Sequence, residues 1–268
     1  MNSRAKALTA AATLALALSP QPGVAGEEWD FTLGIYGYFP DLTGTSNLPT
    51  GGEGDFRIDI GTILDNLEFT LQGNFDARHG RVGIFTDVIY LDVGNSKTGY
   101  SDGTIGGTPI PSDAEATVKL DVESLLWTTS AYYRLFDEAG SSLDVMFGVR
   151  YADLQQTLSW TLEGNASVEP FPGRNGSREI SADYFDGIVG LRGHAALGSG
   201  GKWFVPYYAD IGTGDSDLTW QAAAGIGYAF SRGELMAGWR YLSYDLPTGS
   251  RIEDIEFSGP QVGGTFRW

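Results

Sequence analysis

The residues that could do chemistry are few in this chain of 268 residues. Histidine occurs only at His79 and His194, and the absence of cysteine excludes thiol catalysis, thiolate metal sites and disulfides. Residues 99–103 (GYSDG) fit the G-x-S-x-G pattern, but a nucleophile elbow needs a strand before it, a helix after it and a histidine partner. This copy lies in a glycine-rich segment that lacks them. The sequence therefore predicts no catalytic residue, no cofactor and no metal site.

A second group of candidates consists of charged residues inside otherwise apolar segments. They are Glu68, Asp87, Arg150, Asp186, Arg192, Asp210 and Arg240. Charges are costly in an apolar core unless they are paired, so we expect these acids and arginines to balance one another in a polar, enclosed interior. Two interpretations stay open. We favour a network that plugs the interior over a charged constriction that selects small solutes.

The segments that carry these charges alternate with a period of two, which predicts β-strands. In 218–230, one face carries aliphatic and aromatic residues, and the other carries Thr219, Gln221, glycine and alanine. A soluble sandwich also alternates, but its apolar face packs against a second sheet, where mid-strand charges would be costly. We therefore predict an all-β, antiparallel, up-and-down transmembrane barrel with its apolar face toward lipid.

We count ten such strands, with eight or twelve as alternatives. Their expected spans are 28–40, 67–78, 81–94, 117–135, 143–162, 179–197, 202–213, 218–230, 233–246 and 255–268. Short connections alternate with long ones, which occupy 41–66, 95–116 and 163–178. Short periplasmic turns opposite longer external loops are typical of outer-membrane barrels, and an even count places both termini in the periplasm.

Aromatic residues are expected in two belts, one at each membrane interface. The periplasmic belt would contain Trp29, Tyr133, Trp203, Phe230, Phe266 and Trp268. The outer belt would contain Phe39, Trp127, Trp220 and Tyr241.

Two of the ten strands fit the alternation less well. In 81–94, Asp87 shares a face with large apolar residues, and in 117–135 the apolar face changes sides near Glu123. We expect a β-bulge to explain the change near Glu123. In the first long loop, Thr62 and Asp65 have capping-box spacing, which predicts a short helix that Thr62 caps and that folds against the barrel mouth.

The first 26 residues predict a secretory signal peptide. Arg4 and Lys6 precede an apolar run at 7–18, and small residues follow at 24–26. This run is too short to span a membrane, so we expect 27–268 to form one barrel domain. The formal charge of -17, from 34 acids and 17 bases, argues against a nucleic-acid partner.

The C-terminus carries the spacing of a last-strand assembly signal, with Gly263, Phe266 and the terminal Trp268. Together with the segments at 63–93, 147–154, 184–193, 216–230, 239–246 and 258–268, it resembles small Gram-negative outer-membrane β-barrel proteins of the OmpA/opacity-protein type. The resemblance covers most of 28–268 but includes no peptidoglycan-binding domain. It implies an outer-membrane address, contact with outer-membrane lipids and lipopolysaccharide, and recognition by the outer-membrane assembly machinery. It does not imply one activity, because a fold does not determine function.

These observations predict a monomeric, non-enzymatic outer-membrane barrel with a structural or surface-interaction role. A narrow channel for small solutes is the alternative. A lipid or peptide hydrolase is the least favoured, because the predicted topology places both histidines at the periplasmic end.

Overall fold

A computed structural model describes residues 28–47, 53–65, 67–100, 104–105, 108–109, 115–163, 175–198, 202–248, 250 and 252–268. The expected signal peptide, 1–26, lies outside these residues. Within the described residues, no helix is both long enough and apolar enough to cross a membrane.

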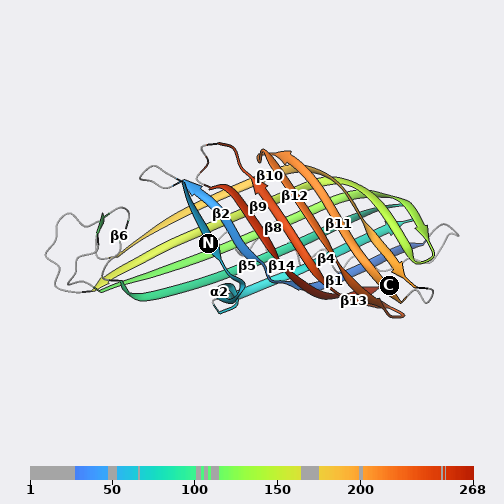
Figure 1. The fold of residues 1–268 in the computed structure, drawn as a ribbon, viewed down its shortest axis with the longest axis horizontal. Coiled ribbons are helices and arrows are strands. Elements are labelled where there is room, and N and C mark those ends of the chain that lie inside the picture. The colour runs from blue at the N-terminus through green and yellow to red at the C-terminus, as the bar shows by residue number, and fades with distance from the viewer. Residues whose placement is uncertain are drawn as a thin grey trace.

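Ten antiparallel strands form a closed barrel (Figure 1). In spatial order they are β1 (Trp29–Tyr38), β4 (Leu67–His79), β5 (Val82–Tyr100), β8 (Glu115–Glu138), β9 (Ser141–Glu163), β10 (Asn175–Leu197), β11 (Trp203–Gly214), β12 (Leu218–Ala229), β13 (Gly233–Asp245) and β14 (Ile252–Arg267). Pairing of β1 with β14 closes the circle. The predicted count of ten and the up-and-down architecture are confirmed.

Short turns join strands at one end of the barrel, which we call the turn end; the opposite end is the loop end. Gly80, Gly140 and Gly198 adopt positive φ angles at the turn end, where a side chain would strain the backbone. Ala139 also has a positive φ, of 52°, next to Gly140 at 76°, as in the tight turns that match strand twist. These reversals set the register of strand pairs that then run far toward the loop end.

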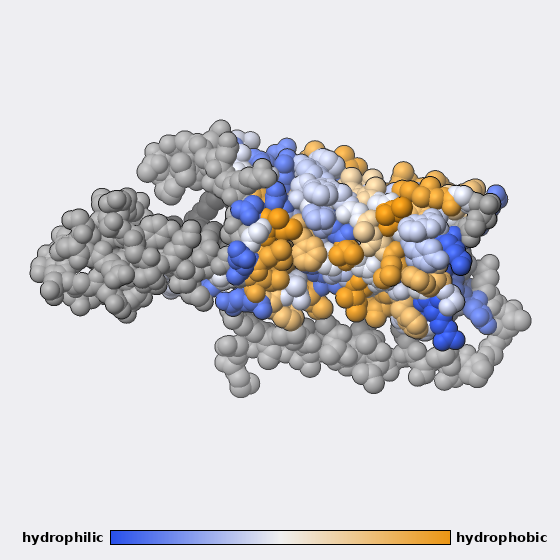
Figure 2. Space-filling view, turned by 60° about the horizontal axis from the view of Figure 1, so that its bottom comes forward, coloured by the Kyte–Doolittle hydropathy of each residue, from blue (hydrophilic) through white to orange (hydrophobic). Residues whose placement is uncertain are grey.

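The outer surface of the barrel is apolar over part of its length. Alternate strand residues such as Ile35, Phe147 and Val189 are 69%, 67% and 58% exposed, which a water-facing surface would disfavour. Figure 2 shows hydrophobic side chains gathered in a band on the barrel, with hydrophilic residues at its edges. The exposed large apolar side chains of β8 lie within 127–136, so this strand of 24 residues extends past them toward the loop end.

Aromatic side chains gather at two levels of this band. Near the turn end, the rings of Phe31 and Phe266 stack on Trp268 with centroids 5.9 and 5.8 Å away. Farther along, Trp220 and Tyr241 stack at 4.6 Å. Rings with polar edges favour the headgroup level of a membrane.

The change of apolar face near Glu123 has a different cause from the expected bulge. The ladders of β8 with β5 and β9 run through this residue without a shift; the only shift between β8 and β9 lies at Arg134/Phe136. Leu126, three residues later, is 5% exposed and packs in the interior. Past the membrane level, water lies outside the barrel, so apolar residues turn inward.

Among the residues that the structure describes, four short strands and one helix lie outside the ten-strand circle. They are β2 (Asp41–Asn47), β3 (Glu53–Ile58), β6 (Thr104–Ile105), β7 (Thr108–Pro109) and α2 (Ile60–Asp65). β2 continues β1 along β14, and β3 pairs with β2.

Helix α2 differs from the predicted helix in its start and in its place. It begins at Ile60, so Thr62 lies inside it, and the backbone N–H of Ile63 bonds the carbonyl of Asp59 at 3.2 Å. The Asp41 carboxylate accepts a hydrogen bond from the N–H of Ile60 at 2.9 Å, which ties α2 to β2. Figure 1 places α2 at the flank where β4 begins, not across the mouth.

Candidate functional site: the barrel interior

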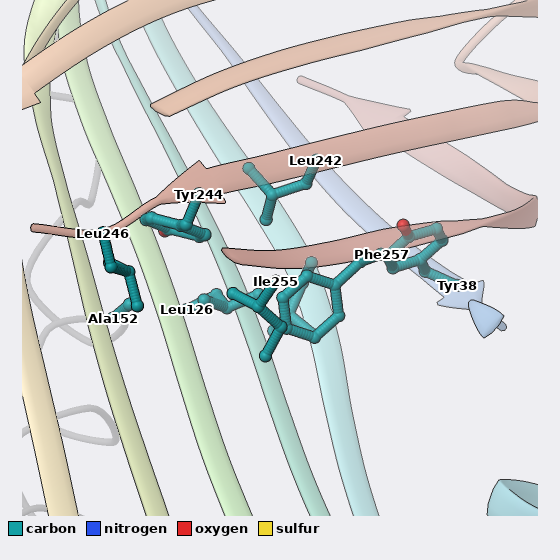
Figure 3. Packing of buried hydrophobic residues seen from close by; sticks show 9 residues of the cluster. Tyr38, Leu126, Ala152, Leu242, Tyr244, Leu246, Ile255 and Phe257 are labelled. Atoms are coloured by element: carbon teal, nitrogen blue, oxygen red, sulfur yellow. The ribbon is translucent and has the colours of Figure 1, made fainter. Parts of the chain in front are cut away.

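The interior at the loop end is filled by an apolar cluster, which we call the apolar plug. Its members are Tyr38, Ile89, Leu126, Ala152, Leu242, Tyr244, Leu246, Ile255 and Phe257, each 5% exposed or less. Figure 3 shows Ile255 of β14 beside Leu126 of β8, although these strands are far apart around the wall. The plug therefore joins opposite walls and excludes water between them.

The first ion pair below the plug links β9 to β11. Arg150 and Asp210 form a salt bridge in which the side chains are 1% and 0% exposed. Arg150 also donates to the hydroxyls of Thr219 (3.0 Å) and Thr128 (3.3 Å), and Tyr208 donates to Asp210 at 2.5 Å. A buried pair of charges is tolerated when hydrogen bonds complete both groups, as they do here for most of the atoms.

The second ion pair crosses the lumen from β13 to β5. Arg240 donates to Asp87 at 2.7 Å and to the amide oxygen of Gln221 at 2.8 Å. Its other terminal nitrogen donates to the hydroxyl of Tyr36 at 3.1 Å, and Tyr36 donates to Asp87 at 2.6 Å. Because β5 and β13 are not neighbours, this pair braces the barrel across its width.

The third group lies nearer the turn end and centres on Arg192 of β10. Arg192 pairs with Asp76 of β4 and, at 3.3 Å, with Asp144 of β9. Its guanidinium lies 4.3 Å from the ring centroids of both Phe85 and Tyr132, so two aromatic faces enclose the cation. Asp144 also accepts from Arg134 at 2.7 Å.

The remaining predicted acids have other roles. Asp186 is 0% exposed, but its carboxylate accepts from the N–H (2.9 Å) and the hydroxyl (2.5 Å) of Ser216, which holds the β11–β12 turn inward. Glu68 is exposed and lies beside a register shift between Leu67 and Phe69. This irregularity removes Glu68 from the inward-facing row, so the expectation that it balances an interior arginine is corrected.

Sequence reasoning did not select several members of the network. Asp76, Asp144 and Arg134 complete the Arg192 group, and Tyr36 and Gln221 complete the Arg240 group. The alternation already places Asp76 and Asp144 on the polar faces of their strands. The tyrosines gave no such signal, because a tyrosine fits either face.

The turn end of the interior contains an open cavity of about 510 Å³, which we call the vestibule. Four arginines and five acids line it: Arg78, Arg134, Arg192, Arg267, Asp30, Asp76, Asp137, Asp144 and Glu234. His194 also lines it, with its Nδ1 atom 3.1 Å from the hydroxyl of Ser142, whose residue is 2% exposed. His79 lies elsewhere, against the ring of Trp29.

The C-terminal residues of the predicted assembly signal lie in the closing seam of the barrel. Trp268 and Phe31 exchange two backbone hydrogen bonds of 3.1 Å. Gly263 faces Tyr36, and a Cβ at this glycine would collide with that residue. Phe266 is 51% exposed on the outer surface.

In the described part of the chain, no cluster of three or more histidine or acidic side chains is arranged to hold a metal ion.

Comparisons with known proteins reveal similarity of structure. No protein-family model matches the chain, and no curated protein is similar to it in sequence. The outer-membrane protease OmpT from Escherichia coli superimposes with a TM-score of 0.51 at 12% identity, over 92% of this chain and 99% of that one. The translocator domain of the autotransporter NalP from Neisseria meningitidis gives a TM-score of 0.38 at 16% identity, over 99% and 95%. Ail from Yersinia pestis gives 0.35 at 9% identity, over 90% and 99%.

The likeness to OmpT, at 12% identity, establishes the fold alone. The expected resemblance to outer-membrane β-barrels is thereby confirmed, while the OmpA/opacity type stays a prediction.

Proposed function

We propose that this chain is a closed, non-enzymatic outer-membrane barrel that acts through the part that projects beyond the membrane, in a structural or surface-interaction role. In this proposal the first 26 residues are removed, residues 27–268 form the barrel, and the turn end with both termini faces the periplasm. The protein is a monomer surrounded by outer-membrane lipids and lipopolysaccharide. The outer-membrane assembly machinery recognises its C-terminal strand. The single observation that supports closure is the buried Arg150–Asp210 pair below the apolar plug.

The projecting part supports a surface role. A transmembrane strand needs about 9–11 residues, whereas β8, β9 and β10 have 24, 23 and 23. Beyond the apolar band, acids lie directly opposite one another, as in Asp92/Glu123 and Asp153/Asp183. Like charges that face each other across strands are tolerated where water or counterions screen them, which fits an exposed, acidic surface.

Two observations favour the non-enzymatic interpretation. His194 contacts Ser142, which borders the vestibule but is only 2% exposed, so its hydroxyl offers very little surface to a substrate. His79 packs on Trp29 near the described N-terminal end.

Conductance in planar bilayers tests closure. We expect the native protein to give no stable openings, because charged and apolar side chains fill the lumen. Replacing the two central arginines together with two members of the apolar plug (R150A and R240A with L126A and F257A) is expected to create openings, whereas R232A, in an exposed turn, is expected to leave the protein without conductance. Stable openings of the native protein would overturn closure and favour the narrow channel.

A further inference from the structure

Helix α2 and the start of β4 carry three large apolar side chains that stay exposed, which we call the α2 patch. Leu64, Phe69 and Leu71 are 47%, 52% and 55% exposed. Only residue 66 separates α2 from β4, so the end of the helix lies within about 7 Å of the strand. Figure 1 shows this junction on the flank of the barrel.

The β4 part of the α2 patch lies at the loop-end edge of the lipid-facing band. Leu71 pairs with Tyr90 of β5, and the ring centroids of Phe69 and Tyr90 are 5.9 Å apart. Phe69 itself pairs with Asp92. An aromatic ring with a polar edge, followed by an acid, marks the change from acyl chains to headgroups. The α2 patch therefore continues the surface of the barrel that faces lipid.

Helix α2 has one apolar face. Ile60, Ile63 and Leu64 have the i, i+3, i+4 spacing that places side chains on one side of a helix, whereas Gly61 and Asp65 lie on the other side. Ile60 and Ile63 are half-buried, but Leu64 is exposed. The helix thus leaves an apolar side chain uncovered at the end nearest to β4.

Hydrogen bonds fix α2 in this position. The Asp41 carboxylate accepts from the N–H of Ile60 at 2.9 Å, and the carbonyl of Asp59 accepts from the N–H of Ile63 at 3.2 Å. The protein itself therefore sets the place of Leu64, and contact with a partner needs little further ordering of the helix.

Lipid is the partner that fits the α2 patch. Elsewhere beyond the band, apolar side chains such as Leu126 turn into the interior, away from water. The side chains of the α2 patch stay exposed, and burial among acyl chains would remove their apolar surface from water. Asp65 and Glu68 are exposed beside them, and apolar residues next to charged ones are typical of segments that lie in a membrane interface.

We propose that α2 is an interfacial anchor. Leu64, Phe69 and Leu71 insert among the acyl chains of the leaflet at the loop end, which is the outer leaflet in the proposed orientation, while Asp65 and Glu68 stay among the headgroups. Since α2 directly follows β3, the anchor holds the membrane-side end of the β2–β3 arm at the lipid surface.

Spin labelling of the full-length barrel in lipid nanodiscs tests the proposal, because the chain has no cysteine of its own. A nitroxide on L64C is compared with one on F147C, in the middle of the band, and one on S181C, an exposed position of β10 beyond the band. We expect the label on L64C to collide with oxygen nearly as often as the label on F147C. Its collisions with a water-soluble nickel complex should be several-fold fewer than those of the label on S181C.

Three results would overturn the anchor. Frequent collisions of the L64C label with nickel, as for S181C, would place α2 in water. Few collisions with either reagent would mean that protein, such as a second copy of the chain, covers the α2 patch. Frequent collisions of the F147C label with nickel would overturn the lipid-facing band itself, and the anchor with it.

A second measurement needs no label. In L64Q a polar side chain of similar length replaces the leucine, and we expect the N–H of Ile63 to exchange with solvent several-fold faster than in the native protein, because the helix detaches more often. The matched control L64M keeps the side chain apolar and should exchange at the native rate. Equal rates in L64Q and L64M would show that α2 gains nothing from lipid and would overturn the proposal.

Discussion

Gln72 and Tyr38 close the barrel wall at the point where the ladder between β1 and β4 ends. The last paired residues are Ile35 and Gly73. Beyond them, the side-chain amide of Gln72 accepts from the backbone N–H of Tyr38 at 2.5 Å and donates to its carbonyl at 3.2 Å. A side chain thus replaces the missing strand pairing, and both residues are buried. Unsatisfied backbone groups at membrane level are costly, so this contact seals the seam.

Replacing Gln72 with leucine should destabilise the barrel by about 1–3 kcal/mol for each backbone group of Tyr38 that loses its partner. Urea unfolding in lipid vesicles measures the change. The same substitution at Gln155, a less buried amide, is the control and should cost much less. Equal stability of Q72L and the native protein would show that the seam needs no such contact.

Removing one partner of the central ion pair should be more costly. In D210N the charge of Arg150 stays buried without its counterion, and we expect a loss of about 3–5 kcal/mol. The double variant R150M with D210L removes both charges and should recover most of that loss, while D217N in an exposed turn should change little. A D210N barrel as stable as the native one in urea would contradict the pairing.

The strand architecture could be predicted from sequence because lipid imposes a strict period of two on each strand. The segment 218–230 shows this alternation, and β12 follows it from Leu218 to Ala229. Beyond the membrane the apolar residues face inward instead of outward, so the change of face near Glu123 has the same sequence pattern as a bulge. The period is two in both parts of a strand, but apolar side chains face outward in the membrane and inward beyond it.

The partners inside the barrel could not be predicted in the same way. Arg240 and Asp87 come from strands on different sides of the barrel and meet across the lumen, so their contact depends on the stagger of the whole barrel. Sequence patterns identify inward charges but not which of them meet. Asp186 shows the limit, because its partner is a turn serine and not an arginine.

Arg192 should not be replaceable by lysine without loss. Its guanidinium bonds two carboxylates and lies between two aromatic rings, and an ammonium cannot keep this planar geometry. We expect R192K to lose about 1.5–3 kcal/mol, the range for hydrogen bonds to charged groups. R232K, in an exposed turn, should be neutral. If R192K and the native protein unfolded at the same urea concentration, the enclosure of Arg192 by two carboxylates and two rings would be contradicted.

Trp268 should matter for assembly more than for stability. Trp268 and Trp203 are 50% and 51% exposed at the same end of the barrel, so they lose similar area when truncated. We expect W268A to lower the amount of folded barrel in outer membranes several-fold, and W203A to lower it little. Refolding yields of the two variants in detergent should be similar. Equal levels in cells would contradict an assembly signal at Trp268.

The most direct test of the account is a single-cysteine scan along 143–151 in a chain that has no cysteine of its own. Protein in lipid vesicles is treated with a lipid-soluble and a water-soluble thiol reagent. The account predicts that the lipid-soluble reagent labels positions 143, 145, 147, 149 and 151, and that positions 146 and 150 resist both reagents because the lumen is filled there. Position 144, which lines the vestibule, is expected to react with the water-soluble reagent only. Uniform labelling by the water-soluble reagent, or a period other than two, would contradict a lipid-facing barrel with a closed interior.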